Sequence, residues 1–419
     1  MIEYDRLVEL VGKDIARKLN RLSDKTLRRV SEEKIKQILE IFEKLGLDRK
    51  ILLNTPSILA RAPVSKIEKI VEVLDKNGID RKILEKNGDI LIATNTDDIE
   101  GILNALKEAG IGRDILETNA SIISHGNPNE IKEIIKILEA EGLGELARIN
   151  GTILSYGKAN NIKEVIEILK KTGIGLDILK TNGNILAFGN PKRIIEIIRI
   201  LEKSGIGTQI LKTNGGILAQ GTPEKIKEII QILKEENIGI NILKTTGDIL
   251  AKGNPIKIKR IIQILRDKKI GTDILKYNGT ILAIGNPDKI LEILDILNSE
   301  NINLKSVTAN LLSVGNPDDI RDIINILKEE KIGTDILNTS ITILEGKPNK
   351  VRKIIEVLRK TEIGTEILRT NASILSAGDP KRIEEIVNVL KDEDIGLEIL
   401  NRTWNYFSSS RAKENEKNN

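Results

Sequence analysis

The sequence repeats itself with a period of 32 residues over most of its length, and this period limits the fold more than any other feature. A Gly-Ile-Gly-like step opens each repeat, and the repeat from Gly205 reads GIGTQILKTNGGILAQGTPEKIKEIIQILKEE. One such repeat cannot bury its own apolar face, so successive repeats must stack on one another. The repeats begin at Gly46, Gly78, Gly110, Gly142, Gly173, Gly205, Asn237, Lys269, Asn301, Lys331, Glu362 and Asp394, and those from Gly142, Asn301 and Lys331 are one or two residues shorter.

The repeat from Gly173 shows how each repeat divides. Asn182 is a favourable N-cap residue with Gly183 after it, so the sequence predicts a short helix over residues 184–188, which we call helix A. Gly189 then predicts a left-handed residue that ends this helix.

A longer helix, helix B, is predicted to follow. Asn190 is its expected cap, and Pro191 stands at the first helical position, where the missing N–H costs nothing. Apolar residues at i, i+3, i+4 and i+7 predict an amphipathic helix that ends near Lys203. A third helical turn is expected over residues 209–212. The apolar positions of helix B are Ile194, Ile197, Ile198 and Leu201.

These patterns predict an all-α protein, an α-solenoid superhelix of about twelve repeats. No segment shows the alternation of a β-strand. We expect a degenerate N-terminal capping repeat over residues 1–45, eleven stacked repeats over 46–393, a partial C-terminal capping repeat over 394–407 and a disordered tail over 408–419.

The composition removes several functional classes. The chain has no cysteine, which excludes disulfides, thiolate metal sites and a thiol nucleophile. Its one histidine, His125, leaves little room for zinc sites or for Ser/His catalysis. The segment from Gly151 to Ala159 resembles a phosphate-binding loop but has one residue too many and no Ser or Thr for magnesium. We therefore expect no enzyme activity, no metal, no cofactor and no small-molecule substrate.

The N-terminal residues and the charge bear on location and partners. Met1-Ile-Glu-Tyr-Asp-Arg6 contains acids and no apolar segment, and no apolar run approaches ~18 residues. We expect a cytoplasmic monomer that does not enter a membrane. The net charge of +4 is too small to indicate nucleic acid by itself, so any polyanion site requires cations gathered in one place.

The repeat resembles that of the mitochondrial transcription termination factor family, whose short helix opens Asn-Pro-x-Leu-Leu and whose longer helix ends Phe-Leu-x-x-Leu-Gly. The matching residues run from Asn54-Thr-Pro56-Ser-Ile-Leu59 through Lys66–Leu74 to Gly78-Ile79, and the resemblance extends from about residue 14 to residue 400. The chain departs from the family in lacking the helix A proline after Pro56 and in having no transit peptide. The resemblance implies a curved α-solenoid with a basic concave surface that binds DNA or RNA. TAL-effector repeats are a second, weaker likeness.

One position differs in almost every repeat, whereas its neighbours hardly change. It lies between a near-constant Ile-Leu-Ala/Ser and Gly-Asn-Pro, and we call its members the variable column. One residue per repeat is how helical-repeat proteins read successive bases, so we predict base contacts here. The column consists of Arg61, Ala93, His125, Tyr156, Phe188, Gln220, Lys252, Ile284, Val314, Glu345 and Ala377, of which all but the two alanines are candidate base contacts.

Two other interpretations of the variable column stay open. It could be an exposed position under no constraint, although such positions in this chain hold mostly Lys, Glu, Asp or Asn. It could also be a half-buried ridge that tolerates any side chain. In the contact interpretation, Arg61, Gln220 and Lys252 hydrogen-bond base edges, and the aromatic members or His125 stack on bases.

Cations at the start of helix B break a local rule. The first turn of a helix favours acids, yet its third residue is Lys or Arg in seven of eleven repeats. We predict a ladder of phosphate sites made by these cations and the free N–H groups beside them. The alternative is that the side chains reach solvent or pair with nearby acids. The seven candidates are Lys66, Arg193, Lys225, Lys257, Lys289, Lys350 and Arg382.

The sequence therefore predicts a nucleic-acid-binding protein, with double-stranded DNA favoured over RNA because of the family resemblance. The alternative is a scaffold whose variable column contacts an extended peptide or a partner protein.

Overall fold

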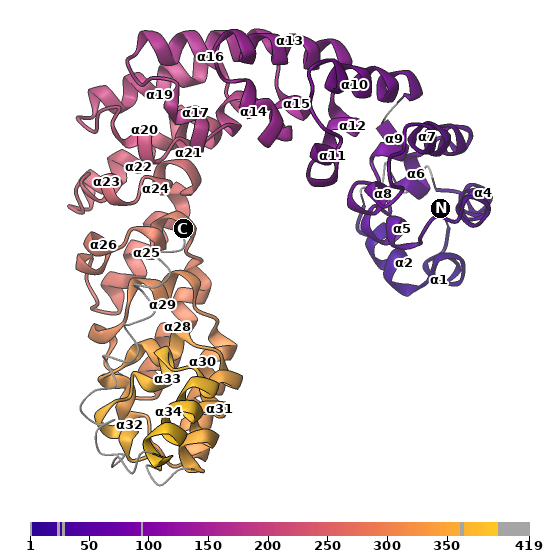
Figure 1. Ribbon diagram of the computed structural model, residues 1–419. Coiled ribbons are helices and arrows are strands. Elements are labelled where there is room, and N and C mark those ends of the chain that lie inside the picture. Colours follow the sequence, from indigo (N-terminus) through magenta and orange to yellow (C-terminus); the bar gives the residue numbers. More distant parts are fainter. Residues whose placement is uncertain (1, 23–25, 27–29, 94, 361–363, 393–419) are drawn as a thin grey trace. The chain divides into compact units, whose positions relative to one another are not determined.

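The computed structural model describes residues 2–22, 26, 30–93, 95–360 and 364–392 (Figure 1). Within these ranges the chain forms α-helices and a few 3₁₀ turns, and no β-strand. Consecutive helices pack against one another, which confirms the predicted all-α fold of the α-solenoid class. The number of repeats remains a sequence-based prediction. The expected C-terminal cap at 394–407 and the tail at 408–419 lie outside the described residues.

Each repeat contains a helix A, a helix B and a third short helix. The A helices are α6 (Ile58–Arg61), α9 (Ile90–Ala93), α12 (Ser121–His125), α15 (Gly151–Tyr156), α18 (Asn184–Phe188), α21 (Gly216–Gln220), α24 (Asp248–Lys252), α27 (Thr280–Ile284), α29 (Ala309–Val314), η3 (Ile341–Glu345) and α33 (Ile374–Ala377).

The B helices are longer, mostly of thirteen residues. They are α4 (Glu32–Leu45), α7 (Val64–Lys76), α10 (Thr96–Glu108), α13 (Pro128–Ala140), α16 (Ala159–Lys171), α19 (Pro191–Lys203), α22 (Pro223–Glu235), α25 (Pro255–Asp267), α28 (Pro287–Ser299), α30 (Pro317–Glu329), α31 (Pro348–Arg359) and α34 (Pro380–Asp392).

Each third helix lies between helix B of one repeat and helix A of the next, and among the described residues two further helices precede α4. The third helices are α5 (Lys50–Asn54), α8 (Ile83–Lys86), α11 (Asp114–Thr118), α14 (Gly144–Ile149), α17 (Asp177–Thr181), α20 (Ile210–Thr213), α23 (Ile242–Thr245), α26 (Asp273–Tyr277), η1 (Leu304–Ser306), η2 (Asp335–Asn338) and α32 (Ile367–Thr370). The two N-terminal helices are α1 (Tyr4–Val11) and α2 (Lys13–Leu19).

The predicted boundaries of helices A and B are confirmed at α18 and α19, and the third turn lies one residue later than expected, at α20. The prediction for Gly189 was wrong. Its backbone is extended, with φ −67° and ψ 129°. A Cβ atom there would clash with the carbonyl oxygen of Ile185 and press on Ile194. Glycine therefore stands at this position because the chain turns too tightly for a side chain.

The expected cap of helix A also differs from the structure. Gly183, with helical φ and ψ, is the N-cap of α18, and the side chain of Asn182 donates to Thr181 Oγ1 at 2.9 Å instead of capping the helix. A Cβ on Gly183 would lie 2.6 Å from Nδ2 of Asn150 in the preceding repeat. The glycine therefore permits close stacking of adjacent repeats.

In the repeats from Gly46 to Lys331, the residue that opens the repeat, just after helix B, is left-handed. Gly205 has φ 77°, a conformation that glycine adopts readily because it has no Cβ atom to clash with the backbone. In four later repeats a non-glycine residue holds the same conformation, with φ of 55° or 56°. The shared backbone geometry supports the alignment of repeats made from the sequence. These four residues are Asn237, Lys269, Asn301 and Lys331.

The core consists of Ile and Leu side chains from all three helix types. Ile185 and Leu186 of α18 and Ile194 and Leu201 of α19 are almost completely buried, as the helical period predicts. Ile195 and Ile200 of α19 are half-buried, which fits a helix that has neighbours on more than one side.

The chain divides into two compact units. The N-terminal unit comprises the residues up to Ile198 together with Leu211–Gln220, and the C-terminal unit comprises Arg199–Ile210 and the residues from Gly221 on. In the N-terminal unit α12, α15, α18 and α21 pack in sequence, as do α10, α13 and α16. In the C-terminal unit α24, α27 and α29 pack in sequence, as do α22, α25, α28 and α30.

Candidate nucleic-acid interface

The variable column has the same structural position in every repeat. Each of its eleven members is the last residue of a helix A, from Arg61 at the end of α6 to Ala377 at the end of α33. Apart from Ala93, whose side chain is not among those described, all of them are exposed. The interpretation as a half-buried ridge is therefore not supported by the geometry.

The apolar members of the column are unusually accessible. Eight large hydrophobic residues are exposed within the described part of the chain, and four of these belong to the column. Their exposed fractions are 40% for Tyr156, 47% for Phe188, 51% for Ile284 and 60% for Val314. Exposed apolar side chains lower solubility and contribute nothing to the core. Their concentration at one repeat position favours contact with a ligand over an unconstrained surface.

The aromatic members form a continuous row in the N-terminal unit. The ring centroids of His125 and Tyr156 are 5.1 Å apart with an interplanar angle of 41°, and those of Tyr156 and Phe188 are 5.6 Å apart at 33°. Inserting a base between two rings requires about twice the 3.4 Å stacking distance of nucleic acid. The rings are too close for this, so a base can lie only against their exposed faces or edges.

The polar members differ in whether their side chains are already bonded. Arg61 and Gln220 make no side-chain hydrogen bond within the described residues. Lys252 forms an ion pair with Asp248 at 2.7 Å on the same short helix. Glu345 accepts hydrogen bonds from two side chains of the preceding repeat, Thr308 and Asn310. Arg61 and Gln220 are therefore free to contact a ligand, whereas Glu345 would first have to break these bonds.

Three of the seven phosphate candidates have free amines. Lys225, Lys257 and Lys289 lie at the third positions of α22, α25 and α28 in the C-terminal unit. Their side chains are exposed and bond to no other described residue. The three lysines occupy successive repeats, which is the arrangement that a linear polyanion requires.

The remaining candidates bond within the protein. Arg193 donates to the carbonyl oxygens of Phe188 and Ala219, both at 2.8 Å. Lys350 donates to Ser376 O at 3.2 Å, and Lys66 to Asn95 Oδ1 at 2.9 Å. Arg382 also has an interaction partner. Lys66, Arg193 and Lys350 are thus held by carbonyl and amide oxygens, whereas the alternative interpretation expected nearby acids or solvent.

Two of these cations, and one further lysine, bond to the same position of the next repeat. Arg193 and Lys350 each reach a carbonyl 26 residues further along the chain, at the end of helix A in the next repeat, and Lys34 does the same to Ala60 O at 2.7 Å. The last carbonyls of a helix carry partial negative charge and lack partners within the helix. A cation that is unfavourable at the start of its own helix is thus favourable at the end of a neighbouring helix. Burial lowers the pKa of the Arg193 guanidinium at this position.

The backbone N–H groups predicted to hold phosphate are partly occupied. Asn254 Oδ1 accepts from the N–H of Lys257 at 3.1 Å, and Asn286 Oδ1 accepts from the N–H groups of Asp288 and Lys289. Thr222, by contrast, makes no cap bond at the start of α22. At α25 and α28 the lysine side chain, rather than the backbone, is the group available to an anion.

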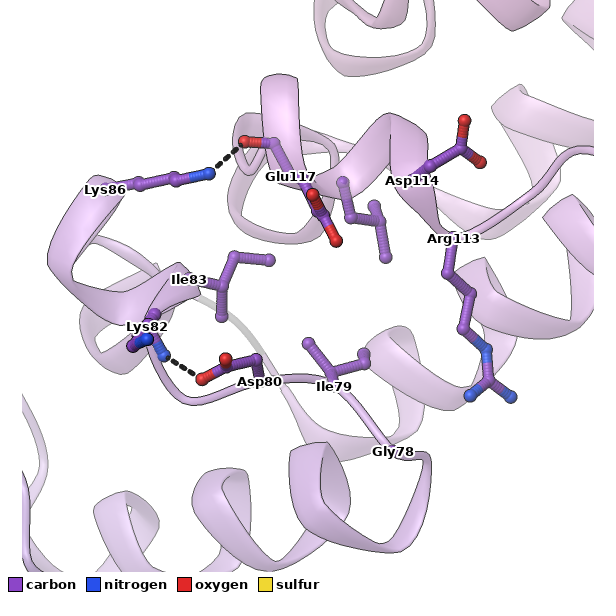
Figure 2. Close-up of a pocket in the computed structure, with 10 residues that line it drawn as sticks. Gly78, Ile79, Asp80, Lys82, Ile83, Lys86, Arg113, Asp114 and Glu117 are labelled. Atoms are coloured by element: carbon purple, nitrogen blue, oxygen red, sulfur yellow. Dashed lines mark hydrogen bonds between the residues drawn. The ribbon is translucent and has the colours of Figure 1, made fainter.

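A cavity of about 290 Å³ lies between two third helices of the N-terminal unit, α8 and α11, where Lys86 Nζ donates to Glu117 O at 2.7 Å (Figure 2). None of the residues that line it belongs to the variable column, and its basic and acidic side chains are equal in number, so it favours no charged ligand. The charged lining residues are Asp80, Lys82, Lys86, Arg113, Asp114 and Glu117.

No model of a known protein family matches the chain, and no curated protein matches its sequence. The similarity to transcription termination factors therefore remains an interpretation of the repeat residues. Among the described residues there is no group of three or more potential metal ligands. None of the described helices combines the length and the apolar character needed to cross a lipid bilayer.

Proposed function

We propose that this protein binds nucleic acid, with double-stranded DNA as the first ligand to test. In this proposal the variable column contacts bases and free lysines at the start of helix B contact phosphates. The observation that carries the proposal is the position of the column: one exposed side chain of changing chemistry ends each helix A whose last side chain is described. A regular series of different side chains suits a ligand made of different units on a regular backbone.

The charge distribution supports the phosphate part of the proposal. The net charge is only +4, but Lys225, Lys257 and Lys289 place unpaired cations at equivalent positions of three successive repeats. Cations in such a series release condensed counterions when they meet a polyanion, and this release favours binding.

The test is equilibrium binding of the full chain to labelled duplex DNA, duplex RNA and single-stranded oligonucleotides of mixed sequence, over a series of salt concentrations. If about six phosphates of duplex DNA are neutralised, log K falls against log salt with a slope near −5. Absence of binding at low salt to all of these ligands contradicts the proposal.

A protein-interaction scaffold is the second candidate, because the column also holds exposed apolar side chains. Ile284 and Val314 occupy successive repeats, and neither can hydrogen-bond a base edge. Such side chains fit the apolar positions of an extended peptide. This candidate predicts binding that changes little with salt, whereas phosphate contacts make binding steeply salt-dependent.

A further inference from the structure

The only histidine of the chain ends a hydrogen-bonded network that crosses two repeats. Asn87 Nδ2 donates to Ser124 Oγ at 2.9 Å, and Ser124 Oγ lies 2.7 Å from Nδ1 of His125. Ser124 is only 8% exposed, and it is one of two buried polar residues in the described chain. The other is Ser155, which precedes Tyr156 in the same way. The buried serines thus lie directly beneath two neighbouring members of the variable column.

The distances in the network favour one set of hydrogen-bond directions. The backbone N–H of Asp89 donates to Asn87 Oδ1 at 3.1 Å, so the amide oxygen of Asn87 is assigned and its Nδ2 faces Ser124. Ser124 Oγ accepts from Asn87, which leaves the hydroxyl hydrogen to be donated. Its nearest acceptor is His125 Nδ1 at 2.7 Å, while Ser121 O is 3.4 Å away. The shorter distance favours donation to Nδ1 over the alternative, in which Ser124 donates to Ser121 O and accepts from a protonated Nδ1. In the neutral imidazole a nitrogen that accepts carries no proton, so this arrangement places the proton on Nε2.

We propose that Asn87 and Ser124 hold His125 in the Nε2–H tautomer, so that its exposed N–H recognises a hydrogen-bond acceptor on a base edge. This inference rests on the proposed function. The imidazole is exposed and packs against the ring of Tyr156, which limits its rotation. The side chain therefore offers the ligand one oriented donor and no acceptor.

A single donor implies a specific preference. In the major groove guanine, adenine and thymine each present an acceptor, whereas cytosine presents only its amino donor. The repeat that contains His125 accordingly disfavours cytosine at its step. Gln220 provides the contrast within the same column, because its free amide can either donate or accept. A glutamine is tolerated at this structural position, which makes His125→Gln a suitable test variant.

The tautomer can be measured without any nucleic acid. With ¹⁵N-histidine labelling, the full chain gives the imidazole signals of His125 alone, because no other histidine is present. At a pH where the ring is neutral, two-bond ¹H–¹⁵N correlation is expected to show Nε2 protonated and Nδ1 unprotonated. Ser124→Ala should move the signals toward a mixture of tautomers, and Ser155→Ala should leave them unchanged. A predominant Nδ1–H form, or spectra unaffected by Ser124→Ala, would overturn the inference.

The recognised base is tested in two stages. Preferred duplexes are first selected from a randomised pool with the wild-type chain and with His125→Gln, and the base step at which the two selected sequences differ is the affected step. Binding of both proteins to four duplexes that differ only at this step is then measured. Wild type should bind the cytosine duplex about 5-fold more weakly than the best duplex, as expected for one lost hydrogen bond. His125→Gln should reduce this difference to below about 2-fold while keeping a similar affinity for the best duplex.

The outcomes separate the inference from the proposed function. If wild type selects a sequence and His125→Gln selects the same sequence with equal discrimination, His125 reads no base and the inference alone fails. A preference for cytosine at the affected step has the same consequence. If wild type binds no nucleic acid, the proposed function fails, and the proposal that His125 recognises an acceptor on a base fails with it. The NMR spectra of the labelled imidazole still show which tautomer is present.

Discussion

The two compact units have the same repeat but use the same two positions differently. In the N-terminal unit the variable column carries three rings in successive contact and the side chains of Arg61 and Gln220, which bond to no described residue, while Arg193 at the start of α19 is bonded within the protein. In the C-terminal unit Lys225, Lys257 and Lys289 at that helix start bond to no described residue, whereas Lys350 and Arg382 near its C-terminal end have partners.

Residues at the same position of the repeat therefore make different contacts in the two units. The column of the C-terminal unit consists of Lys252 and Glu345, which are bonded to protein groups, the apolar Ile284 and Val314, and Ala377. We therefore expect the N-terminal unit to supply base contacts and the C-terminal unit to supply phosphate contacts.

The largest effect is expected from changing Lys225, Lys257 and Lys289 together to Ala. Each phosphate contact contributes about 0.9 to the salt slope, so the slope should flatten by about 2.7. At 0.1 M salt each contact is worth roughly 8-fold, and the triple variant should bind several hundred-fold more weakly. The matched control changes Lys180, Lys212 and Lys244, which lie at the ends of third helices, to Ala. Equal flattening by both triple variants would show that only net charge matters.

Arg193→Met should destabilise the protein, because it removes two hydrogen bonds to the ends of neighbouring A helices while keeping an apolar stem. We expect a loss of about 1–3 kcal/mol in the free energy of unfolding, measured by urea denaturation. Lys257→Met is the control, since that lysine has no partner among the described residues. It should change stability by less than about 0.5 kcal/mol. Similar losses in both variants would contradict the distinction between bonded and free cations.

Phe188→Ala should weaken nucleic-acid binding by about 10-fold, because contact between a base and an aromatic face is lost. Phe188→Tyr should retain most of the affinity. Val314→Ala, at the equivalent position of the C-terminal unit, should cost less than about 3-fold because it removes no ring. A larger loss for Val314→Ala than for Phe188→Ala would place the main base contacts in the other unit, or would favour an apolar peptide as the ligand.

Gln220→Arg should have the smallest effect on overall affinity and the most local one. Arginine pairs with guanine through two hydrogen bonds, so the preference at one base step should shift toward guanine by about 5-fold, as measured by competition among duplexes that differ at single steps. A uniform change across all steps would mean that Gln220 lies beside the phosphates rather than beside a base.

Much of the fold could be predicted from the sequence. The boundaries of α18 and α19 follow from caps, proline and the helical period, because these signals act within a few residues. The exposure of the variable column was also predictable from its changing chemistry. Gly189 was misinterpreted because glycine serves both positive φ and close approach. Only the neighbouring atoms, Ile185 O for Gly189 and the Asn150 side chain for Gly183, show that close packing requires these two glycines.

The sequence by itself determined the period, the three helices of each repeat and the residues that end every helix A. Only the tertiary structure decided which cations bond within the protein, since Arg193 and Lys225 occupy the same sequence position and, among the described residues, only Arg193 of the two donates to a carbonyl of the next repeat. It also decided the contacts between the rings and the hydrogen-bond partners of His125. The physical reason is distance along the chain: capping and periodicity act over a few residues, whereas these bonds join atoms about one repeat apart and depend on how the repeats stack.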